Sequence, residues 1–366
     1  MGRVPNEFPF EVLEKHGHYH FRTIGDLSMQ AVFRLRGRLD VEQVNRALRL
    51  CVARYPILGC GVKVGVWKLR WVMRTDLEHI RWCDLVETTQ VDEELHRFNL
   101  IRCAPWEGDP LVQARLIRGP DGDVLCLKSN HAVSDAIGFK EMIYAFCDFF
   151  EKLQNEPHFV PDPQLDCERS MGQIVKDISW IQAARLFFQA RRDDLKLKEP
   201  PIPFGFPFVV GDRAERRFLS HSFPAVSVER MKGYARARGA SFNDLLNTLF
   251  AHAVYARFSP GRAKPLLYFN AIDLRRYSRA VRKIEGPRNL STFAVFKVIP
   301  AENADFDSLL KTFSDRVKLL RRASAIGLGG YFQLKLRNFI PNRLLTQKLE
   351  KKWKKYEPYV KKGIFI

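Results

Sequence analysis

Two histidine–aspartate pairs in this chain have a spacing that can place a base beside a carboxylate. They are His131 with Asp135 and His158 with Asp162. Histidine is the side chain whose unperturbed pKa suits proton transfer near neutral pH. Spacing alone does not distinguish the two pairs, because so short a motif occurs by chance in a long chain. The elements around each pair have to decide which of them carries chemistry.

His131 follows a predicted pair of strands and precedes a predicted helix. Residues 111–119 and 123–130 are strand-like, and the Pro-Asp-Gly between them has the chemistry of a tight turn. Apolar residues then recur at helical spacing. His158 instead lies in the proline-broken segment 157–163, where neither element is predicted. The first pair therefore has a setting in which a rigid scaffold presents functional groups, and we interpret the second as a coincidence.

Composition indicates a folded protein. The 366 residues are enough for two sizeable cores, and 46% of them are hydrophobic and 12% aromatic. No apolar run has the length of a membrane-spanning helix, and the start lacks the apolar core of a signal peptide. The seven cysteines are scattered without a CxxC pair, as is typical of reduced proteins. We therefore expect a cytoplasmic location.

Positive charge is concentrated towards the C-terminal end. The net charge is +19, and residues 310–366 hold 15 Lys/Arg against three acidic residues. Such a field attracts phosphate-bearing ligands, acidic proteins or anionic membranes, and a solvated basic helix face is the simpler alternative. Trp353, Tyr356 and Tyr359 among these lysines favour peripheral contact with an anionic membrane. No recognised nucleic-acid-binding module is present, so we expect no nucleic-acid partner.

Two alternating segments have a functional and a structural interpretation. His16, His18 and His20 would share one face of a strand and could bind a metal there. No carboxylate or cysteine follows at ligand spacing, so we predict no metal site. Residues 62–74, which include Trp67, alternate between aromatic and basic side chains. This pattern favours a half-buried strand, with a nucleic-acid stacking platform as the alternative.

Strands and helices recur on both sides of a proline-rich region. Proline-rich stretches at 157–163 and 199–207 bracket a predicted helical segment, and we interpret residues 157–212 as a connector. We therefore predict an α/β protein with mixed sheets and two lobes. Residues 1–156 form the lobe with the His131 motif, and residues 213–366 form the lobe with the basic stretch.

The second half repeats the same kinds of element. Strands are predicted at 217–223, 264–272 and 292–299, and helices at 227–238 and 309–320. Ser241 and Asp244 have the spacing of a capping box at the start of another helix. That helix is expected to bury its apolar residues, which are Leu245, Leu246, Leu249, Phe250, Ala253 and Val254.

Residues 130–136, Asn-His-Ala-Val-Ser-Asp-Ala, resemble the His-His-x-x-x-Asp-Gly signature of the CoA-dependent acyltransferase superfamily. That superfamily includes chloramphenicol acetyltransferase, peptide-synthetase condensation domains and wax-ester synthases. Further segments resemble it in order and spacing, and these are 36–40, 54–58, 109–111, 241–244, 270–275 and 289–293. The resemblance extends over roughly residues 28–325. It implies two chloramphenicol-acetyltransferase-like lobes that face each other across a tunnel.

The resemblance also implies an activity. An acyl group would move from a CoA or carrier-protein thioester to an alcohol or amine, with His131 as general base. Asp135 would hold the loop through an arginine of the second lobe, which is Arg275 or alternatively Arg276. The residues expected near the site are Asn130, Ala136, Gly138, Asn289 and Ser291. Acyl-CoA or acyl-phosphopantetheine would be the donor substrate, an acidic acyl carrier protein would be a partner, and no cofactor would be bound permanently.

The chain departs from the family pattern at three points. Asn130 replaces the first His, and Ala136 replaces the Gly, which adds a methyl group but keeps an N–H that can stabilise an oxyanion. Residues 362–366 resemble a strand cut short, so we expect a second lobe that is reduced or incomplete. A catalytically impaired protein that binds acyl-CoA or a carrier protein is therefore the alternative function.

Overall fold

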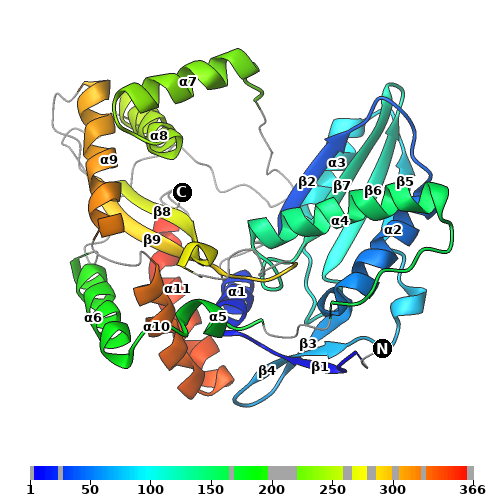
Figure 1. The fold of residues 1–366 in the computed structure, drawn as a ribbon, viewed down its shortest axis with the longest axis horizontal. Coiled ribbons are helices and arrows are strands. Elements are labelled where there is room, and N and C mark those ends of the chain that lie inside the picture. Colours follow the sequence, from blue (N-terminus) through cyan, green and yellow to red (C-terminus); the bar gives the residue numbers. More distant parts are fainter. Residues whose placement is uncertain are drawn as a thin grey trace. The chain divides into compact units, whose positions relative to one another are not determined.

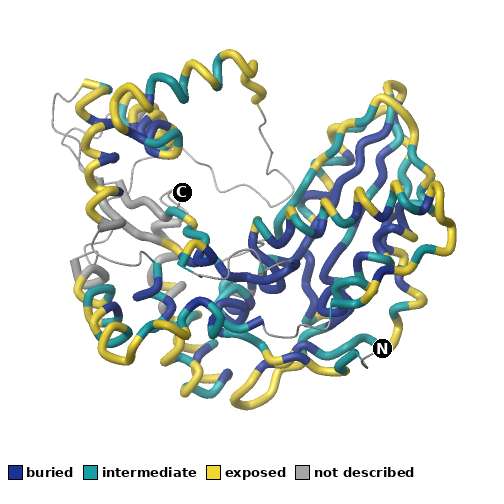
Figure 2. Tube along the Cα trace, in the orientation of Figure 1, coloured by how far each residue is buried: buried dark blue, intermediate teal, exposed yellow. Residues whose placement is uncertain are grey.

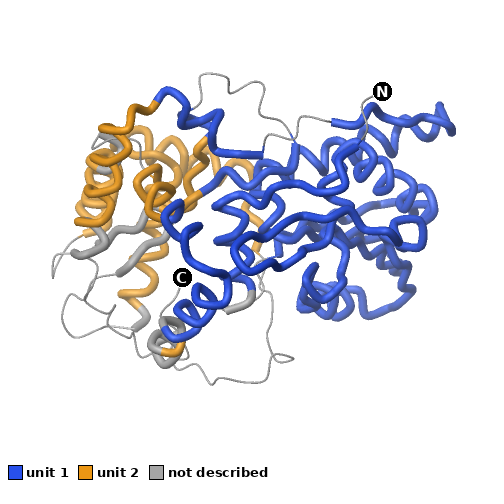
Figure 3. Tube along the Cα trace, turned by 90° about the horizontal axis from the view of Figure 1, so that it is seen from below, with its two compact units in different colours: residues 1–177, 275–291, 334–351 blue, residues 178–274, 292–333, 352–366 orange. Residues whose placement is uncertain are grey.

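The computed structural model describes residues 4–23, 28–164, 169–196, 221–258, 266–277, 286–298, 305–322 and 327–360. The chain divides into two compact units, each made of segments that are distant in sequence (Figure 3). Unit 1 comprises residues 1–177, 275–291 and 334–351, and unit 2 comprises residues 178–274, 292–333 and 352–366. The lobes predicted at 1–156 and 213–366 stay a prediction.

Unit 1 contains a mixed four-stranded sheet in the order β2-β7-β6-β5 (Figure 1). Its strands are β2 (Met29–Arg34), β5 (Cys83–Glu87), β6 (Val112–Gly119) and β7 (Gly122–Ser129). β7 lies antiparallel to β2 and β6, and β5 lies parallel to β6. The hairpin predicted from Pro-Asp-Gly is present, and its Gly122 has a φ of 130°, which favours glycine.

Helices cover both faces of this sheet. α2 (Val41–Arg54) and α4 (Ala136–Asn155) share one apolar core with Leu125 and Leu127 of β7. α3 (Val91–Leu100) lies on the opposite face, where Lys128 Nζ donates to the Phe98 carbonyl at 3.1 Å. Because both faces are covered, β7 is buried along nearly its whole length (Figure 2).

A second sheet of unit 1 corrects one prediction. Its antiparallel strands have the order β1-β4-β3, with β1 (Glu7–Pro9), β3 (Cys60–Val64) and β4 (Leu69–Met73). The single strand predicted over 62–74 is wrong, because the chain turns at Gly65, whose N–H donates to Lys68 O at 3.0 Å. As a result Trp71 is buried and Trp67 is exposed, so the two do not share a face.

The three alternating histidines lie on a helix, α1 (Val12–Thr23), and not on a strand. His16 and His20 are therefore neighbours, with ring centroids 3.9 Å apart, whereas His18 packs edge-on against Phe10. Among the residues that the structure describes, no group of three His, Cys, Asp or Glu side chains is arranged to hold a metal ion.

Unit 2 is mainly helical. It contains α6 (Trp180–Lys196), α7 (Ala225–Ala237), α8 (Phe242–Phe258), α9 (Phe306–Arg322) and most of α10 (Leu328–Leu336). Its two-stranded sheet pairs β8 (Leu266–Asp273) with β9 (Ser291–Val298). The short α5 (Gly172–Val175) belongs to unit 1, and α11 (Asn342–Val360) has residues in both units.

The helix α8 confirms one prediction and corrects another. The capping box is present, since Ser241 N–H donates to Asp244 Oδ2 at 2.8 Å and Asp244 N–H donates to Ser241 Oγ at 3.1 Å. Leu245 and Val254 are buried, but four of the residues predicted to be buried are exposed, namely Leu246, Leu249, Phe250 and Ala253. The apolar residues of α8 occur on all sides of the helix, so their spacing does not indicate which face is buried.

Some predictions fall outside the described residues. These include most of the strand at 217–223, the proline-rich stretch at 199–207 and the end of the chain at 362–366. Within the described part of the chain, no helix combines the length and the apolar character needed to cross a bilayer.

Candidate functional site

The loop that carries His131 leaves the buried end of β7 and enters α4. Its first residue, Asn130, has no exposed surface. The Asn130 side chain donates through Nδ2 to the Cys103 carbonyl at 2.8 Å and accepts through Oδ1 from the Ala132 N–H at 2.9 Å. Its backbone N–H donates to the Leu111 carbonyl at 3.0 Å. Asn130 therefore fixes the start of the loop from inside the protein.

Asp135 closes the loop and caps α4. Its Oδ1 accepts from the Gly138 N–H at 2.9 Å, as an N-cap residue does. Its Oδ2 accepts from the Leu290 N–H at 2.8 Å and from Arg275 Nη1 at 2.7 Å. The side chains of Asp135 and Arg275 are only 4% and 5% exposed. The structure thus brings Asp135 together with Arg275, while the alternative partner Arg276 is exposed.

A second segment, residues 286–291, lies against the loop. The backbone N–H of Asp135 donates to the Arg288 carbonyl at 2.9 Å, and Asn289 Nδ2 donates to the His131 carbonyl at 2.8 Å. Asn289 is therefore adjacent to the loop, as the resemblance implies. Ser291 is one step further away, with its Oγ 3.4 Å from Asn289 Oδ1.

Gly138 allows this segment to come close to the first turn of α4. A Cβ at Gly138 would lie 2.6 Å from Ser134 Oγ, 2.8 Å from Arg288 N and 2.9 Å from Gly286 O. No side chain is tolerated at such distances without a shift of the backbone. Ala136, which is also expected near the site, is the first residue of α4 and is exposed.

A second buried arginine braces the loop, and no pattern in the sequence predicts this role. Arg169 donates through Nη2 to the Val133 carbonyl at 2.6 Å and through Nη1 to the Pro287 carbonyl at 2.5 Å. Its charge is balanced by Glu14, whose Oε1 lies 2.5 Å from Nη2. The other Glu14 oxygen accepts from Trp71 Nε1 at 2.8 Å. Arg169 thus adds a further connection between the loop and segment 286–291, beside those made by Asp135 and Asn289.

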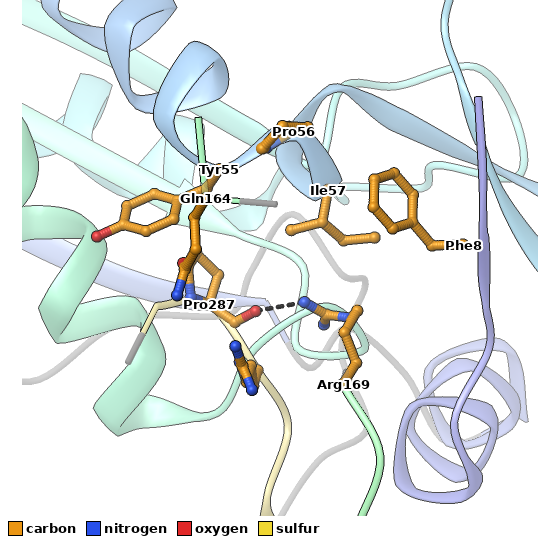
Figure 4. A pocket seen from close by; sticks show the side chains of 8 residues that line it. Phe8, Tyr55, Pro56, Ile57, Gln164, Arg169 and Pro287 are labelled. Atoms are coloured by element: carbon orange, nitrogen blue, oxygen red, sulfur yellow. Dashed lines mark hydrogen bonds between the residues drawn. The ribbon is translucent and has the colours of Figure 1, made fainter. Parts of the chain in front are cut away.

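Beside Arg169 lies a small cavity (Figure 4). Its volume of ≈ 20 Å³ is close to that of a single water molecule. Apolar side chains of Phe8 and Ile57 and the ring of Tyr55 form part of its wall. We infer that this cavity is too small for a substrate.

The His131 side chain differs from the rest of the loop. It is partly exposed, whereas its neighbours Asn130, Ala132 and Asp135 are buried. Its carbonyl is held by Asn289, but no hydrogen bond to its imidazole is found among the described residues. A ring on a rigid loop without a local partner can accept a proton from a bound substrate.

Three buried cysteines of unit 1 do not supply an alternative reactive group. Burial raises the pKa of the thiols of Cys60, Cys83 and Cys126 to about 12. These thiols are therefore neutral at physiological pH and are poor nucleophiles.

This chain is similar to known proteins in its structure, and its sequence shows no match. No protein-family model and no curated protein matches the sequence. The first condensation domain of the calcium-dependent antibiotic synthetase is similar with a TM-score of 0.66 at 15% identity, over 89% of this chain and 79% of that one. The epimerization domain of the third module of tyrocidine synthetase B has a TM-score of 0.63 at 16% identity, over 92% and 76%.

A third similar structure is polyketide synthase associated protein 5 of Mycobacterium tuberculosis. Its TM-score is 0.56 at 15% identity, over 88% of this chain and 76% of that chain. At identities this low, the structural similarity establishes the fold alone. The chain therefore has the fold of these condensation and epimerization domains, a mixed α/β fold.

Proposed function

We propose that this protein is an acyltransferase in which His131 is the general base. The observation that carries the proposal is the contrast within one loop. Asp135 is buried and accepts three hydrogen bonds, while the imidazole of His131 is partly exposed and has no partner among the described residues. The carboxylate therefore has a structural role, and the imidazole is left for proton transfer.

The reaction follows from ordinary acyl-transfer chemistry. The neutral imidazole takes the proton of the acceptor's hydroxyl or amine. The oxygen or nitrogen of that acceptor group attacks the thioester carbonyl carbon at the same time. A C–O or C–N bond forms, and the carbonyl oxygen becomes an oxyanion. The C–S bond then breaks, and the thiolate takes the proton back from the imidazolium. No oxidant, metal or further reactant is needed for this balance.

The oxyanion requires a donor that is already in place. The backbone N–H of Ala136 is our candidate, because it lies at the first position of α4, where helical N–H groups have no intrahelical acceptor. The positive end of the helix adds a favourable field for a developing negative charge. The methyl group of Ala136 leaves this N–H unchanged.

Condensation domains transfer acyl groups between substrates bound to carrier proteins, which favours a thioester on phosphopantetheine as the donor. Acyl-CoA offers the same reacting group. The excess of 60 Lys/Arg over 41 Asp/Glu attracts both a phosphate-bearing cofactor and an acidic carrier protein. The acceptor is an alcohol or an amine, and no cofactor is bound permanently.

The test compares two histidine variants. Thiol release from acyl-CoA in the presence of an alcohol or amine is measured for the native protein, His131→Ala and His158→Ala. His158 is the matched control, because it is exposed and belongs to the other His-x3-Asp pair. Loss of a general base lowers the rate by about 10²–10⁴-fold. We therefore expect this loss in His131→Ala and an unchanged rate in His158→Ala.

The alternative is a binding protein without turnover. Binding of acyl-CoA or of an acyl carrier protein at equal affinity by native protein and His131→Ala, with no thiol release from either, would support it. Equal thiol release by both proteins would refute the role of His131.

A further inference from the structure

An exposed apolar patch of unit 1 has no part in the site described above. One portion is the turn of the β3–β4 hairpin, and the other is the junction between α10 and α11. Trp67 in the turn is 55% exposed, and Phe339 in the junction is 77% exposed. Monomeric proteins rarely leave large apolar side chains grouped in this way. We call this set the tip patch, and it comprises Val64, Val66, Trp67, Leu336, Phe339 and Leu344.

The two portions of the tip patch are joined by Asn342, the first residue of α11. Its backbone N–H donates to the Val66 carbonyl at 2.8 Å, and its Nδ2 donates to the Gly65 carbonyl at 2.6 Å. Its Oδ1 accepts from the hydroxyl of Tyr19 at 2.8 Å, so Asn342 is itself held in place. Below the turn, Leu69 and Leu345 share a small apolar core. Figure 1 shows the β3–β4 turn and the start of α11 along the same edge.

Basic residues are frequent in the two chain segments that carry the tip patch. Residues 63–70 and 335–351 contain eight Lys/Arg and one acidic residue, Glu350. Glu7 pairs with two of the cations, at 3.8 Å from Lys63 and 3.3 Å from Arg70. In the described part of the chain, four others have no ion-pair partner, and these are Lys68, Lys335, Arg343 and Lys348.

We propose that the tip patch docks the protein on an anionic lipid surface. Tryptophan favours the membrane–water interface, apolar side chains beside it enter the acyl boundary, and the surrounding cations contact lipid phosphates. A protein partner fits less well, because lysines are depleted from the centres of protein interfaces. The docking surface thus lies at the hairpin turn and the start of α11.

The test is co-sedimentation of the full chain with lipid vesicles. One preparation contains phosphatidylcholine alone, and the other contains phosphatidylcholine with phosphatidylserine. The variant Trp67→Ser/Phe339→Ser removes the apolar anchors, and Lys68→Gln/Arg343→Gln removes two cations. The matched control is Trp180→Ser/Phe188→Ser, which removes a tryptophan and a phenylalanine of 79% and 63% exposure from α6. Circular dichroism of each variant reports whether it is folded.

We expect the native protein to bind the phosphatidylserine vesicles and to dissociate as salt is added. The anchor variant loses about tenfold or more in partitioning into the vesicles, since it lacks the two apolar side chains that would enter the bilayer. The charge variant loses about 25-fold, at about fivefold for each cation. The control stays within about twofold of the native protein.

Three results would overturn the proposal. The first is no binding of the native protein to phosphatidylserine vesicles. The second is native-like binding by the folded anchor variant. The third is an equal loss in the anchor variant and in the α6 control, which would indicate binding through general surface hydrophobicity. A site-specific loss on phosphatidylserine vesicles, absent on phosphatidylcholine alone, supports it.

Discussion

The ion pair between Asp135 and Arg275 is open to a quantitative test by a double-mutant cycle. The variants are Asp135→Ala, Arg275→Met and the two together. Asp135→Ala leaves the Arg275 guanidinium without its carboxylate at 5% exposure, which costs about 3–5 kcal/mol. It also removes the cap of α4, which costs about 1 kcal/mol. Arg275→Met leaves the carboxylate with two backbone N–H donors, so we expect a cost near the lower end, about 3 kcal/mol.

The double variant has no buried unpaired charge at this point. Its loss of stability is therefore smaller than the sum of the two single losses, by a coupling energy of about 2 kcal/mol. The control is Arg34 with Asp92, a pair of similar length, 2.6 Å, whose side chains are 61% and 81% exposed. For an exposed pair we expect a coupling energy of about 0.5 kcal/mol or less.

Urea unfolding followed by far-ultraviolet circular dichroism measures all of these free energies. A coupling energy at Asp135 and Arg275 that does not exceed that of Arg34 and Asp92 would show that burial adds nothing. In that case the carboxylate would not be the brace of the loop. The same reasoning would be contradicted if either single variant lost less stability than the cap of α4 alone contributes, which is about 1 kcal/mol.

Two further predictions concern the packing of the loop. Gly138→Ala is expected to lower the free energy of unfolding by about 1–3 kcal/mol and to reduce activity, since its Cβ would collide with the backbone of segment 286–291. Gly233→Ala, where nothing lies within 4 Å, is the helical control and is expected to raise the free energy of unfolding by up to about 1 kcal/mol, and urea unfolding measures both variants. Asn130→His restores the family's first histidine but loses two buried side-chain bonds, so we expect a loss of about 1–3 kcal/mol and no gain in thiol release. A faster enzyme of unchanged stability would refute the anchoring role of Asn130.

Local patterns in the sequence predicted the position of the loop. The strand ending at Ser129, the turn before it and the helix after Asp135 each have a short-range signal, namely β propensity, turn chemistry and apolar spacing. Arg275 was accessible only through the family resemblance. Nothing in the sequence near Asp135 indicates which arginine reaches it, because a contact over 140 residues leaves no periodic trace.

Two structural features are not predicted by the sequence, for identifiable reasons. Arg169 pairs with Glu14 across 155 residues and follows a proline-rich segment, where neither helical nor strand spacing points to a buried charge. At the β3–β4 hairpin, the alternation in the sequence continues from residue 62 to 74, and this continuity hides the turn. Gly65 was the available signal, since a glycine inside an alternating run often marks a bend.

The hydrogen bonds that brace the His131 loop have a consequence for folding order. Those from Asp135 to Arg275 and Leu290, and from Asn289 to His131, close chain loops of 140 to 158 residues. Closing so long a loop costs entropy before any contact repays it. During synthesis the β6–β7 hairpin and α4 can therefore pair first, while the loop of His131 remains unbraced until residue 290 has emerged from the ribosome. The loop of His131 is thus braced only after most of unit 1 has been synthesised, although its histidine is made early.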